Sequence, residues 1–331
     1  MNMPSESKLV SVFIPTFNGR MYIKECLDGV LRQNLPESYR LEVLVIDSGS
    51  TDGTVEILTG FVPRIRLIEI PNCEFGHGKT RQRAAEVCKG EFILYLTQDA
   101  TPASKDWILS MIEPFFLNDR VGCVFGRQTP RRNAVPTIKR EISAAFSSVG
   151  NSNAITLYSS YRLVDEVETS PACVFFSDVN SAVRRSVLLN AVPFRNVPYA
   201  EDQALAADML AKGYIKAYAG KANVIHSNKY DIRSYYHRKF DEYAHLARLG
   251  QDNPASVRSL CLDWIYPTLC DWAFIWRDPE YSTRAKVVWS IRAPLYNLAD
   301  KAGRYFGVKY AHVEEKLAGH SLDARMRRSK V

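Results

Sequence analysis

The chain has 331 residues, of which 46% are hydrophobic and 24% are charged, so its composition excludes an intrinsically disordered protein. Its length suits one large α/β domain with an appendage, or two smaller domains. The net charge of +7 is uneven, because residues 255–331 contain 13 Lys or Arg and 8 Asp or Glu, which amounts to +5. This basic end predicts an anionic partner, such as a membrane surface or phosphates.

The first half of the chain alternates short apolar runs with amphipathic stretches, which predicts strands alternating with helices. Strands are expected at 9–14, 41–46, 65–70 and 91–96, and helices at 21–33, 54–61 and 79–88. This β-α-β-α order predicts a mostly parallel sheet with helices on both faces. Such a sheet binds its ligand at the carboxyl ends of the strands.

The pattern changes after residue 105 and becomes helical from residue 232 onward. Between these points helices are expected at 107–116 and 201–212, strands at 121–126, 175–184, 215–218 and 223–225, and a mixed segment rich in Ser, Asn and Arg at 127–170. Gly213 is the expected C-cap of the helix at 201–212.

The seven cysteines are scattered and form no CxxC pair, which favours reduced thiols in a cytosolic protein and argues against a zinc site. The first ten residues lack the pattern of a signal peptide. No apolar run reaches the roughly 18 uncharged residues that a membrane span needs. We therefore expect a cytoplasmic protein without a transmembrane segment.

Polar motifs follow three of the predicted strands: Pro15-Thr16-Phe17-Asn18, Asp47-Ser48-Gly49-Ser50 and Gln98-Asp99-Ala100. The second motif continues to Thr54 and precedes a helix, so its small residues and free amides suit a ligand that approaches the backbone. The alternative is an ordinary strand–turn–helix link in which Asp52 or Thr51 caps the helix.

Two acidic positions stand out for their chemistry. Asp99 ends a buried strand and suits a divalent metal, but a turn aspartate that caps the next helix would look the same. Glu201 and Asp202 begin a helix, where they either stabilise the helix dipole or include a general base.

Three basic or imidazole side chains have weaker signals. His226 ends a predicted strand and is either a ligand or a structural histidine. His77 and Arg81 are four residues apart at the start of a helix, where they either clamp an anion or form a solvated helix end.

Five motifs in this order resemble the family 2 glycosyltransferases, which have a GT-A fold. They are VFIPTFNG (12–19), VIDSGSTDGT (45–54), YLTQDATP (95–102), SDVNSAVRRSVL (177–188) and YAEDQALAADMLAKGY (199–214). FGHGKTRQ (75–82) and TQDA are similar to the subgroup that transfers L-rhamnose from dTDP-rhamnose. The resemblance implies a Rossmann-like GT-A domain, residues 1–250, and a helical C-terminal region, residues 251–331.

The resemblance also implies roles for individual residues. The residues expected to contact the donor nucleotide are Pro15, Thr16, Asn18, Asp47, Ser48, Gly49, Asp52 and Gln98. The resemblance places His77 and Arg81 beside the diphosphate or sugar, and Asp178 and Asn180 facing the sugar and acceptor. Asp202 is the expected base, with Glu201 second.

For the metal, the resemblance implies Mg²⁺ or Mn²⁺ bound by Asp99, with His226 completing its shell. Two departures predict a weak dependence on metal. Asn228 stands where many relatives have a histidine, and the single Asp99 replaces a D-x-D pair of carboxylates.

The expected reaction is direct displacement with inversion, in which a base takes the proton of an acceptor hydroxyl. The expected product is a surface polysaccharide or O-antigen-like glycan, built on a lipid-linked acceptor. The alternatives are a UDP-sugar donor, a non-catalytic sugar-binding subunit of a synthase, and a sugar nucleotidyltransferase. A sugar nucleotidyltransferase should carry a Gly-rich loop with a basic residue near its N-terminus. The segment IPTFNGRMY (14–22) is not such a loop.

The C-terminal region combines aromatic and basic residues. Trp264, Trp272 and Trp276 share a four-residue lattice, which puts them near one helix face, and Pro267 would bend or split that helix. Trp with Lys and Arg is the composition of a helix that lies on an anionic membrane. The alternative is that these aromatics close the core or a homo-oligomer interface. No nucleic-acid-binding module is recognisable.

Overall fold

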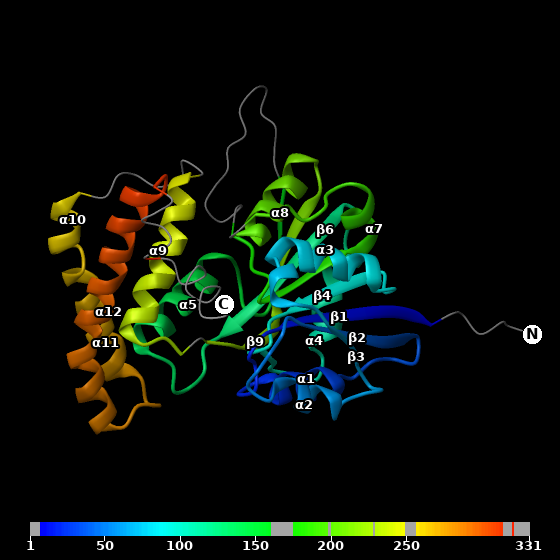
Figure 1. Cartoon of the computed structure of the whole chain (residues 1–331), viewed down its shortest axis with the longest axis horizontal. Helices are drawn as coiled ribbons and strands as arrows, with labels where there is room; N and C mark the ends of the chain where they lie inside the picture. The colour runs from blue at the N-terminus through cyan, green and yellow to red at the C-terminus, as the bar shows by residue number, and fades with distance from the viewer. Residues whose placement is uncertain are drawn as a thin grey trace, which may run out of the picture. The chain divides into compact units, whose positions relative to one another are not determined.

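The computed structural model describes residues 7–159, 175–197, 200–227, 229–248, 256–313 and 320 (Figure 1). The chain divides into two compact units. The first combines residues 1–129 with 143–226, and the second combines 130–142 with 227–331. This division differs from the predicted boundary at residue 250, because the helix that starts at Ile232 belongs to the second unit.

The first unit is built on one nine-stranded sheet in the order β3-β2-β1-β4-β8-β6-β9-β5, with β7 beside β9. The strands are β1 (Lys8–Thr16), β2 (Tyr39–Asp47), β3 (Arg66–Glu69), β4 (Phe92–Leu96), β5 (Thr101–Pro102), β6 (Val121–Thr129), β7 (Ile155–Tyr158), β8 (Asn180–Arg184) and β9 (Ile215–Ile225). Strands β1 to β4 are parallel to one another, as the sequence predicts. Strand β8 runs antiparallel to both β4 and β6, so the whole sheet is mixed.

The helices of this unit cover both faces of the parallel strands. They are α1 (Ile23–Leu31), α2 (Thr54–Thr59), η1 (Asn72–Glu74), α3 (His77–Val87), α4 (Trp107–Ile112), η2 (Glu113–Phe116), α7 (Arg185–Asn190) and α8 (Glu201–Ala211). Helix α1 lies on one face and α3 on the other (Figure 1). Because both faces are covered, β4 is buried along its whole length, which explains its uninterrupted apolar sequence FILYL.

One detail of the second half of this unit differs from the sequence prediction, and another agrees with it. The strands expected at 215–218 and 223–225 form one strand, β9. Gly220, within β9, interrupts the apolar pattern of the sequence. Glycine is needed there because an added Cβ would be 2.3 Å from the carbonyl oxygen of Asn151. Gly213 has φ +81, in agreement with its predicted role at the end of α8.

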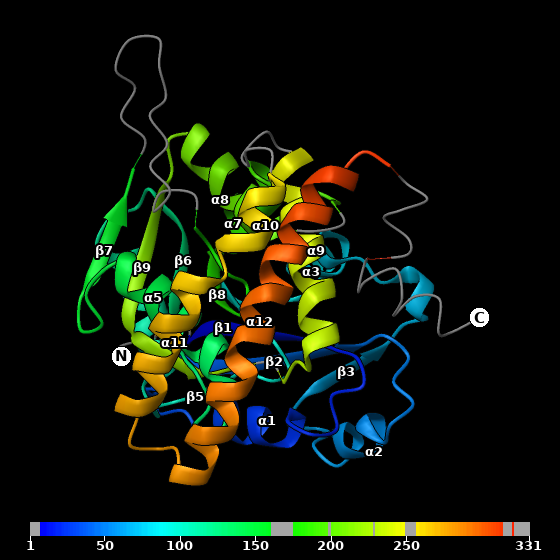
Figure 2. The ribbon, with the colours of Figure 1, turned by 90° about the vertical axis from the view of Figure 1, so that its left-hand side faces the viewer.

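The second unit is helical. Its helices are α9 (Ile232–Arg248), α10 (Val257–Leu262), α11 (Ile265–Arg277) and α12 (Thr283–Tyr310), and it includes the first half of α5 (Pro136–Ser148). Figure 2 shows α11 and α12 side by side. Helix α12 carries Gly303 and Gly307 where it faces α9, and because these residues have no side chain the two helix backbones approach closely. A Cβ at either position would collide with the α9 backbone. The predicted break near Pro267 occurs between α10 and α11.

No helix within the described ranges is both long and apolar enough to cross a membrane.

Candidate active site

The loops that follow β1 and β2 are locked together by side chains. Asn18, with φ +48, donates its backbone N–H to Ser50 Oγ (2.8 Å) and accepts from Thr51 N through its side-chain oxygen (2.9 Å). Gly19 N donates to Thr54 Oγ1 at 2.9 Å. The two strand ends therefore form one rigid rim, which is a suitable place for a nucleotide to contact the backbone.

Asp47 organises the second of these loops. Its side chain is fully buried, and Oδ1 accepts from the backbone N–H groups of Gly49 (3.0 Å) and Ser50 (2.8 Å). Oδ2 accepts from Ser50 Oγ at 2.5 Å. Both carboxylate oxygens of Asp47 therefore form hydrogen bonds within the turn. Gly49 adopts the φ of +83 that this turn requires.

The N-cap of α2 is Gly53, so neither Asp52 nor Thr51 is the capping residue, although Asp52 still bonds to the first residue of the helix. Asp52 Oδ1 accepts from the backbone N–H of Thr54 at 3.1 Å and from Thr54 Oγ1. Its Oδ2 accepts from the backbone N–H of Arg20 at 3.1 Å, which joins the two loops once more. Burial opposes the charge, but these hydrogen bonds outweigh it and lower the pKa of Asp52.

Gln98 connects the end of β4 to the same rim. Its amide forms a two-bond pair with the backbone of Phe17, with Oε1 accepting from N at 2.9 Å and Nε2 donating to O at 2.9 Å. An added Cβ at Gly19 would be 2.2 Å from Gln98 Oε1, so a larger residue there would displace the Gln98 amide from its bonds to Phe17. Strand β1 lies between β2 and β4, which is the point of an α/β sheet where ligands bind.

Asp99 and His226 meet beside this point. His226 Nε2 is 3.4 Å from Asp99 Oδ2, although the two residues end different strands far apart in the sequence. His226 Nδ1 is 3.1 Å from Gln128 Oε1, and Gln128 Nε2 donates to Ser177 Oγ, so the amide oxygen faces the imidazole. Nδ1 therefore faces an acceptor, and Nε2 is the nitrogen directed at Asp99. Burial disfavours the charge on Asp99, but His226 outweighs it and lowers the pKa of Asp99 to about 2.

This pair suits a divalent cation that is shared with a phosphate. An ionised carboxylate and an imidazole nitrogen are both accepted ligands of Mn²⁺, and Mg²⁺ prefers the oxygen. Within the described part of the chain, no group of three or more His, Cys, Asp or Glu side chains is placed to hold a metal. The protein thus offers two ligands, and the rest of the shell would come from water and donor oxygens.

A second group of charged residues is buried between α3, α8 and the segment before β8. Arg81 Nε is 2.8 Å from Asp178 Oδ2, and Arg81 Nη1 is 2.8 Å from Glu201 Oε1. Asp202 Oδ2 accepts from the backbone N–H of Asp178 at 3.2 Å. We call Arg81, Asp178, Glu201 and Asp202 the acid cluster, which contains three carboxyl groups and one guanidinium.

The acid cluster has two more carboxyl groups than cations, and this imbalance contributes to its pKa shifts. Burial, followed by repulsion from Glu201 and Asp178, raises the pKa of Asp202 to about 8. Burial also raises the pKa of Asp178, against the effect of Arg81. A carboxyl whose pKa lies near neutral pH is a stronger base than an ordinary aspartate, because it holds a proton more tightly.

The acid cluster adjoins the end of β4. Leu96 of β4 pairs with Asn180 of β8, and Thr97 N donates to Val179 O at 3.3 Å, which places Asp178 next to this end. The hydroxyl of Tyr95 donates to the carbonyl of Arg81 at 3.3 Å. Asp99 follows on the same strand end, so both acidic centres lie at one edge of the sheet.

A family model described as "Glycosyl transferase family 2" matches residues 11–190, which is more than half of the chain. The chain belongs to glycosyl transferase family 2. This confirms the family predicted from the five motifs, and the protein is a glycosyltransferase.

Two curated relatives are similar over most of the glycosyltransferase. "O-antigen chain rhamnosyltransferase RfbN" of Salmonella typhimurium is 32% identical over 237 residues, which cover 70% of each chain. "O-antigen chain rhamnosyltransferase WbaN" of Salmonella anatum is 33% identical over 235 residues, which also cover 70% of each chain.

Solved structures support the GT-A fold. The mannosyltransferase PcManGT of Pyrobaculum calidifontis, in complex with GDP-Man and Mn²⁺, superposes with a TM-score of 0.55 at 20% identity. That match covers 92% of this chain and 86% of the other. S. aureus TarS 1-349 in complex with UDP-GlcNAc gives 0.51 at 17% identity and covers 91% and 90%.

Most of the glycosyltransferase residues singled out from the sequence lie at this edge. Those at the strand ends are Pro15, Thr16, Asn18, Asp47, Ser48, Gly49, Asp52, Gln98, Asp99 and His226. Asn228, which replaces a histidine and therefore predicts weak metal dependence, lies outside the described residues. The basic residues at 325–330 also lie outside them.

Three residues have surroundings that differ from the expectation. Arg81 is buried in the acid cluster, with two carboxylates on its guanidinium, while His77 at the start of α3 packs edge-on against Phe75. Asn180 is fully buried, and its amide bonds to Trp107 Nε1 and to two backbone carbonyls. Asn180 therefore supports the core and does not face a substrate.

The sequence analysis missed two residues that shape the site. Gln128 orients His226, and Ser181 donates to Asp178 Oδ1 at 2.6 Å. Ser181 is three residues after Asp178 in the SDVNS motif, a spacing that suits a local side-chain hydrogen bond. Gln128 has no such signal, because it reaches His226 only through the pairing of β6 with β9.

Proposed function

We propose that this glycosyltransferase moves L-rhamnose from dTDP-β-L-rhamnose onto a hydroxyl of a growing, lipid-linked surface polysaccharide or O-antigen. The observation that carries the proposal is the pair of acidic centres at one sheet edge, in a chain that shares 32% and 33% identity with two O-antigen chain rhamnosyltransferases. The mechanism assigns one centre to the donor and the other to the acceptor.

The donor nucleotide binds the rim formed by the loops after β1 and β2. The backbone groups there are held by Asn18, Asp47 and Asp52, so these side chains act mainly by presenting a preformed surface. A preformed surface lowers the entropic cost of binding. His77, near the start of α3, remains our candidate for the diphosphate or sugar.

The leaving diphosphate gains negative charge as the glycosidic bond breaks. Asp99 and His226 would hold a Mg²⁺ or Mn²⁺ ion, which when bound neutralises that charge. With one carboxylate and one imidazole from the protein, the dependence on metal is weak compared with a site that has several carboxylates.

Asp202 acts as the general base for the acceptor hydroxyl. With its pKa raised to about 8, Asp202 is a strong base in its deprotonated form, which becomes the dominant form above neutral pH, and the N–H of Asp178 fixes one of its oxygens. Glu201 pairs with Arg81, which leaves Asp202 as the carboxyl of the two without a guanidinium partner among the described contacts. With a single base opposite the leaving group, the acceptor hydroxyl displaces the diphosphate in one step. This inverts the configuration at the anomeric carbon.

The acceptor is lipid-linked in this proposal, so the enzyme works on the cytoplasmic face of the cell membrane as a peripheral protein. The basic C-terminal region supports this location, since anionic lipids attract Lys and Arg.

The test is a transfer assay with purified protein and a panel of lipid-linked and synthetic acceptors, read by mass spectrometry. We expect a mass gain of one deoxyhexose with dTDP-rhamnose. Thermal shifts across nucleotide sugars give a separate readout, in which dTDP-rhamnose should stabilise most. Transfer from a UDP-sugar with none from dTDP-rhamnose would overturn the donor, and no transfer from any donor would favour a non-catalytic binding subunit.

A further inference from the structure

Helices α11 and α12 bury a polar network on one side and expose many large apolar side chains on the other. Asp271, fully buried, accepts from Thr137 Oγ1 (2.7 Å) and from Asn297 Nδ2 (2.7 Å), and its Oδ1 is 2.5 Å from Arg140 Nε. This buried polar network holds the two helices within the second unit. An ordinary surface helix keeps its large apolar side chains on the inward face.

The outward faces carry two apolar stripes. Their side chains, exposed by 40% or more, are Ile265, Tyr266, Leu269, Trp272 and Trp276 on α11 and Val287, Val288, Ile291, Leu295 and Leu298 on α12. The positions repeat every three or four residues on each helix, so each set forms one continuous stripe. Exposed apolar surface of this extent marks a site of association.

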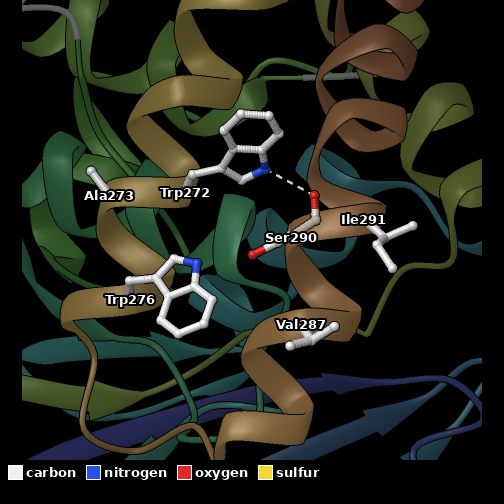
Figure 3. Close-up of a pocket in the computed structure, with 6 residues that line it drawn as sticks. All are labelled: Trp272, Ala273, Trp276, Val287, Ser290 and Ile291. Carbon is white, nitrogen blue, oxygen red and sulfur yellow. Dashed lines mark hydrogen bonds between the residues drawn. The ribbon is translucent and has the colours of Figure 1, made fainter.

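A shallow groove of about 550 Å³ lies between the stripes (Figure 3). Two tryptophans line it from α11, and Val287, Ser290 and Ile291 line it from α12. The indole N–H of Trp272 donates to the carbonyl of Ser290 at 2.8 Å, so its one polar group is already satisfied by the protein. The groove therefore presents hydrocarbon and aromatic surface to whatever covers it.

The charges exposed on these two helices are all positive. Seven Lys or Arg occur on them, of which Arg277, Arg284, Arg292 and Lys309 are exposed and Lys286, Lys301 and Arg304 are half-buried. Their only acids are Asp271 and Asp300, and both are buried. Arg292, next to Ile291 in the stripe, lies 5.7 Å from the ring of Trp289.

We propose that the stripes of α11 and α12 lie in the interface of an anionic bilayer, with the tryptophans among the headgroups and the cations against the lipid phosphates. This deepens the proposed function, because it assigns the surface by which the enzyme would meet a lipid-linked acceptor. A symmetric pair of chains fits less well, since a two-fold contact would set the same cations against each other. Anionic lipid neutralises them instead.

The test is sedimentation of the full chain with vesicles of phosphatidylcholine alone and with phosphatidylglycerol added. We expect binding to the anionic vesicles that weakens as salt is raised. Ile291→Gln should weaken it about tenfold, because it removes one large apolar side chain from the contact. Leu117→Gln is the matched control, since Leu117 is a 58% exposed apolar residue of the first unit, and it should bind as the wild type does.

Three results would overturn the proposal. They are recovery of the chain in the supernatant with both vesicle types, equal binding by Ile291→Gln and wild type, and a dimer in solution that Ile291→Gln abolishes without any vesicle binding. Transfer to a short soluble acceptor reports on the proposed function alone. A chain that binds vesicles without transferring sugar, or transfers sugar without binding vesicles, separates the two ideas.

Discussion

At the scale of single residues, Asp202 has an environment that suits proton transfer. Burial, and then the charges of Glu201 and Asp178, raise the pKa of Asp202, and Arg81 limits the increase. We predict that Asp202→Asn lowers kcat by about 10²–10⁴-fold, the usual contribution of a general base, and leaves the Kd of the donor nearly unchanged. Steady-state kinetics and calorimetry measure the two quantities, and turnover close to wild type would show that another group is the base.

Asp202→Asn, which should lower kcat, should also raise the stability of the folded protein at high pH. The folded-state pKa of Asp202 is above its unfolded value, so the folded protein binds the proton more tightly and loses stability as pH rises from about 4 to about 8. Asp202→Asn removes this loss. We predict nearly equal Tm values at pH 4, at the lower end of this window, and a Tm at pH 8 that is at least about 2–4 °C higher in the variant, which corresponds to about 1 kcal/mol or more. A lower Tm at pH 8 would mean that Asp202 is stabilised as an anion.

Asp99 differs from Asp202 in that its pKa is lowered, so it is an anion at neutral pH. If it binds the donor through a divalent ion, Asp99→Ala should weaken donor binding by about tenfold or more in the presence of Mn²⁺, and much less in EDTA. Asp106→Ala is the control, because Asp106 lies at the start of α4 in the same unit and bonds to Asn34. Equal donor affinity of Asp99→Ala and wild type with metal present would remove Asp99 from the donor site.

At the scale of elements, Arg81 joins α3 to α8 and to the segment before β8. It is buried, and it forms one ion pair with Asp178 before β8 and one with Glu201 of α8. We predict that Arg81→Met destabilises the protein by about 3–5 kcal/mol, because it leaves buried carboxylates unpaired. Arg83→Met, on the same helix with a half-exposed side chain and a 3.9 Å pair to Glu74, should cost less than about 1 kcal/mol in urea unfolding. Similar losses for both would mean that the charges of the acid cluster do not matter.

The elements of the parallel half of the sheet could be predicted from the sequence. Each has the hydrophobic periodicity of a strand or a helix, and polar or turn residues mark where it ends. The run FILYL ends at Thr97, and the turn residues Asn18 and Gly49 follow β1 and β2. The antiparallel place of β8 between β4 and β6 has no local signal, because it depends on pairing between segments about 90 and 60 residues apart. The partners of Arg81 and Asn180 depend on that pairing, and so their burial could not be predicted.

At the scale of the whole molecule, the work is divided between the two units. Both acidic centres and the rim at the strand ends belong to the first unit. The second unit contributes helices α11 and α12, which bury Asp271 and expose Trp272 and Trp276. Our two proposals therefore assign catalysis and membrane contact to different residues, which mutations can separate.

The central claim is that the pair Asp99–His226 and the acid cluster form one active site. A crystal structure of the protein with dTDP-rhamnose and Mn²⁺ tests it most directly. Our account predicts the diphosphate beside Asp99 and His226, with the Asp202 carboxylate on the opposite side of the anomeric carbon. A donor bound at the same rim with its anomeric carbon directed away from Asp202 would contradict it.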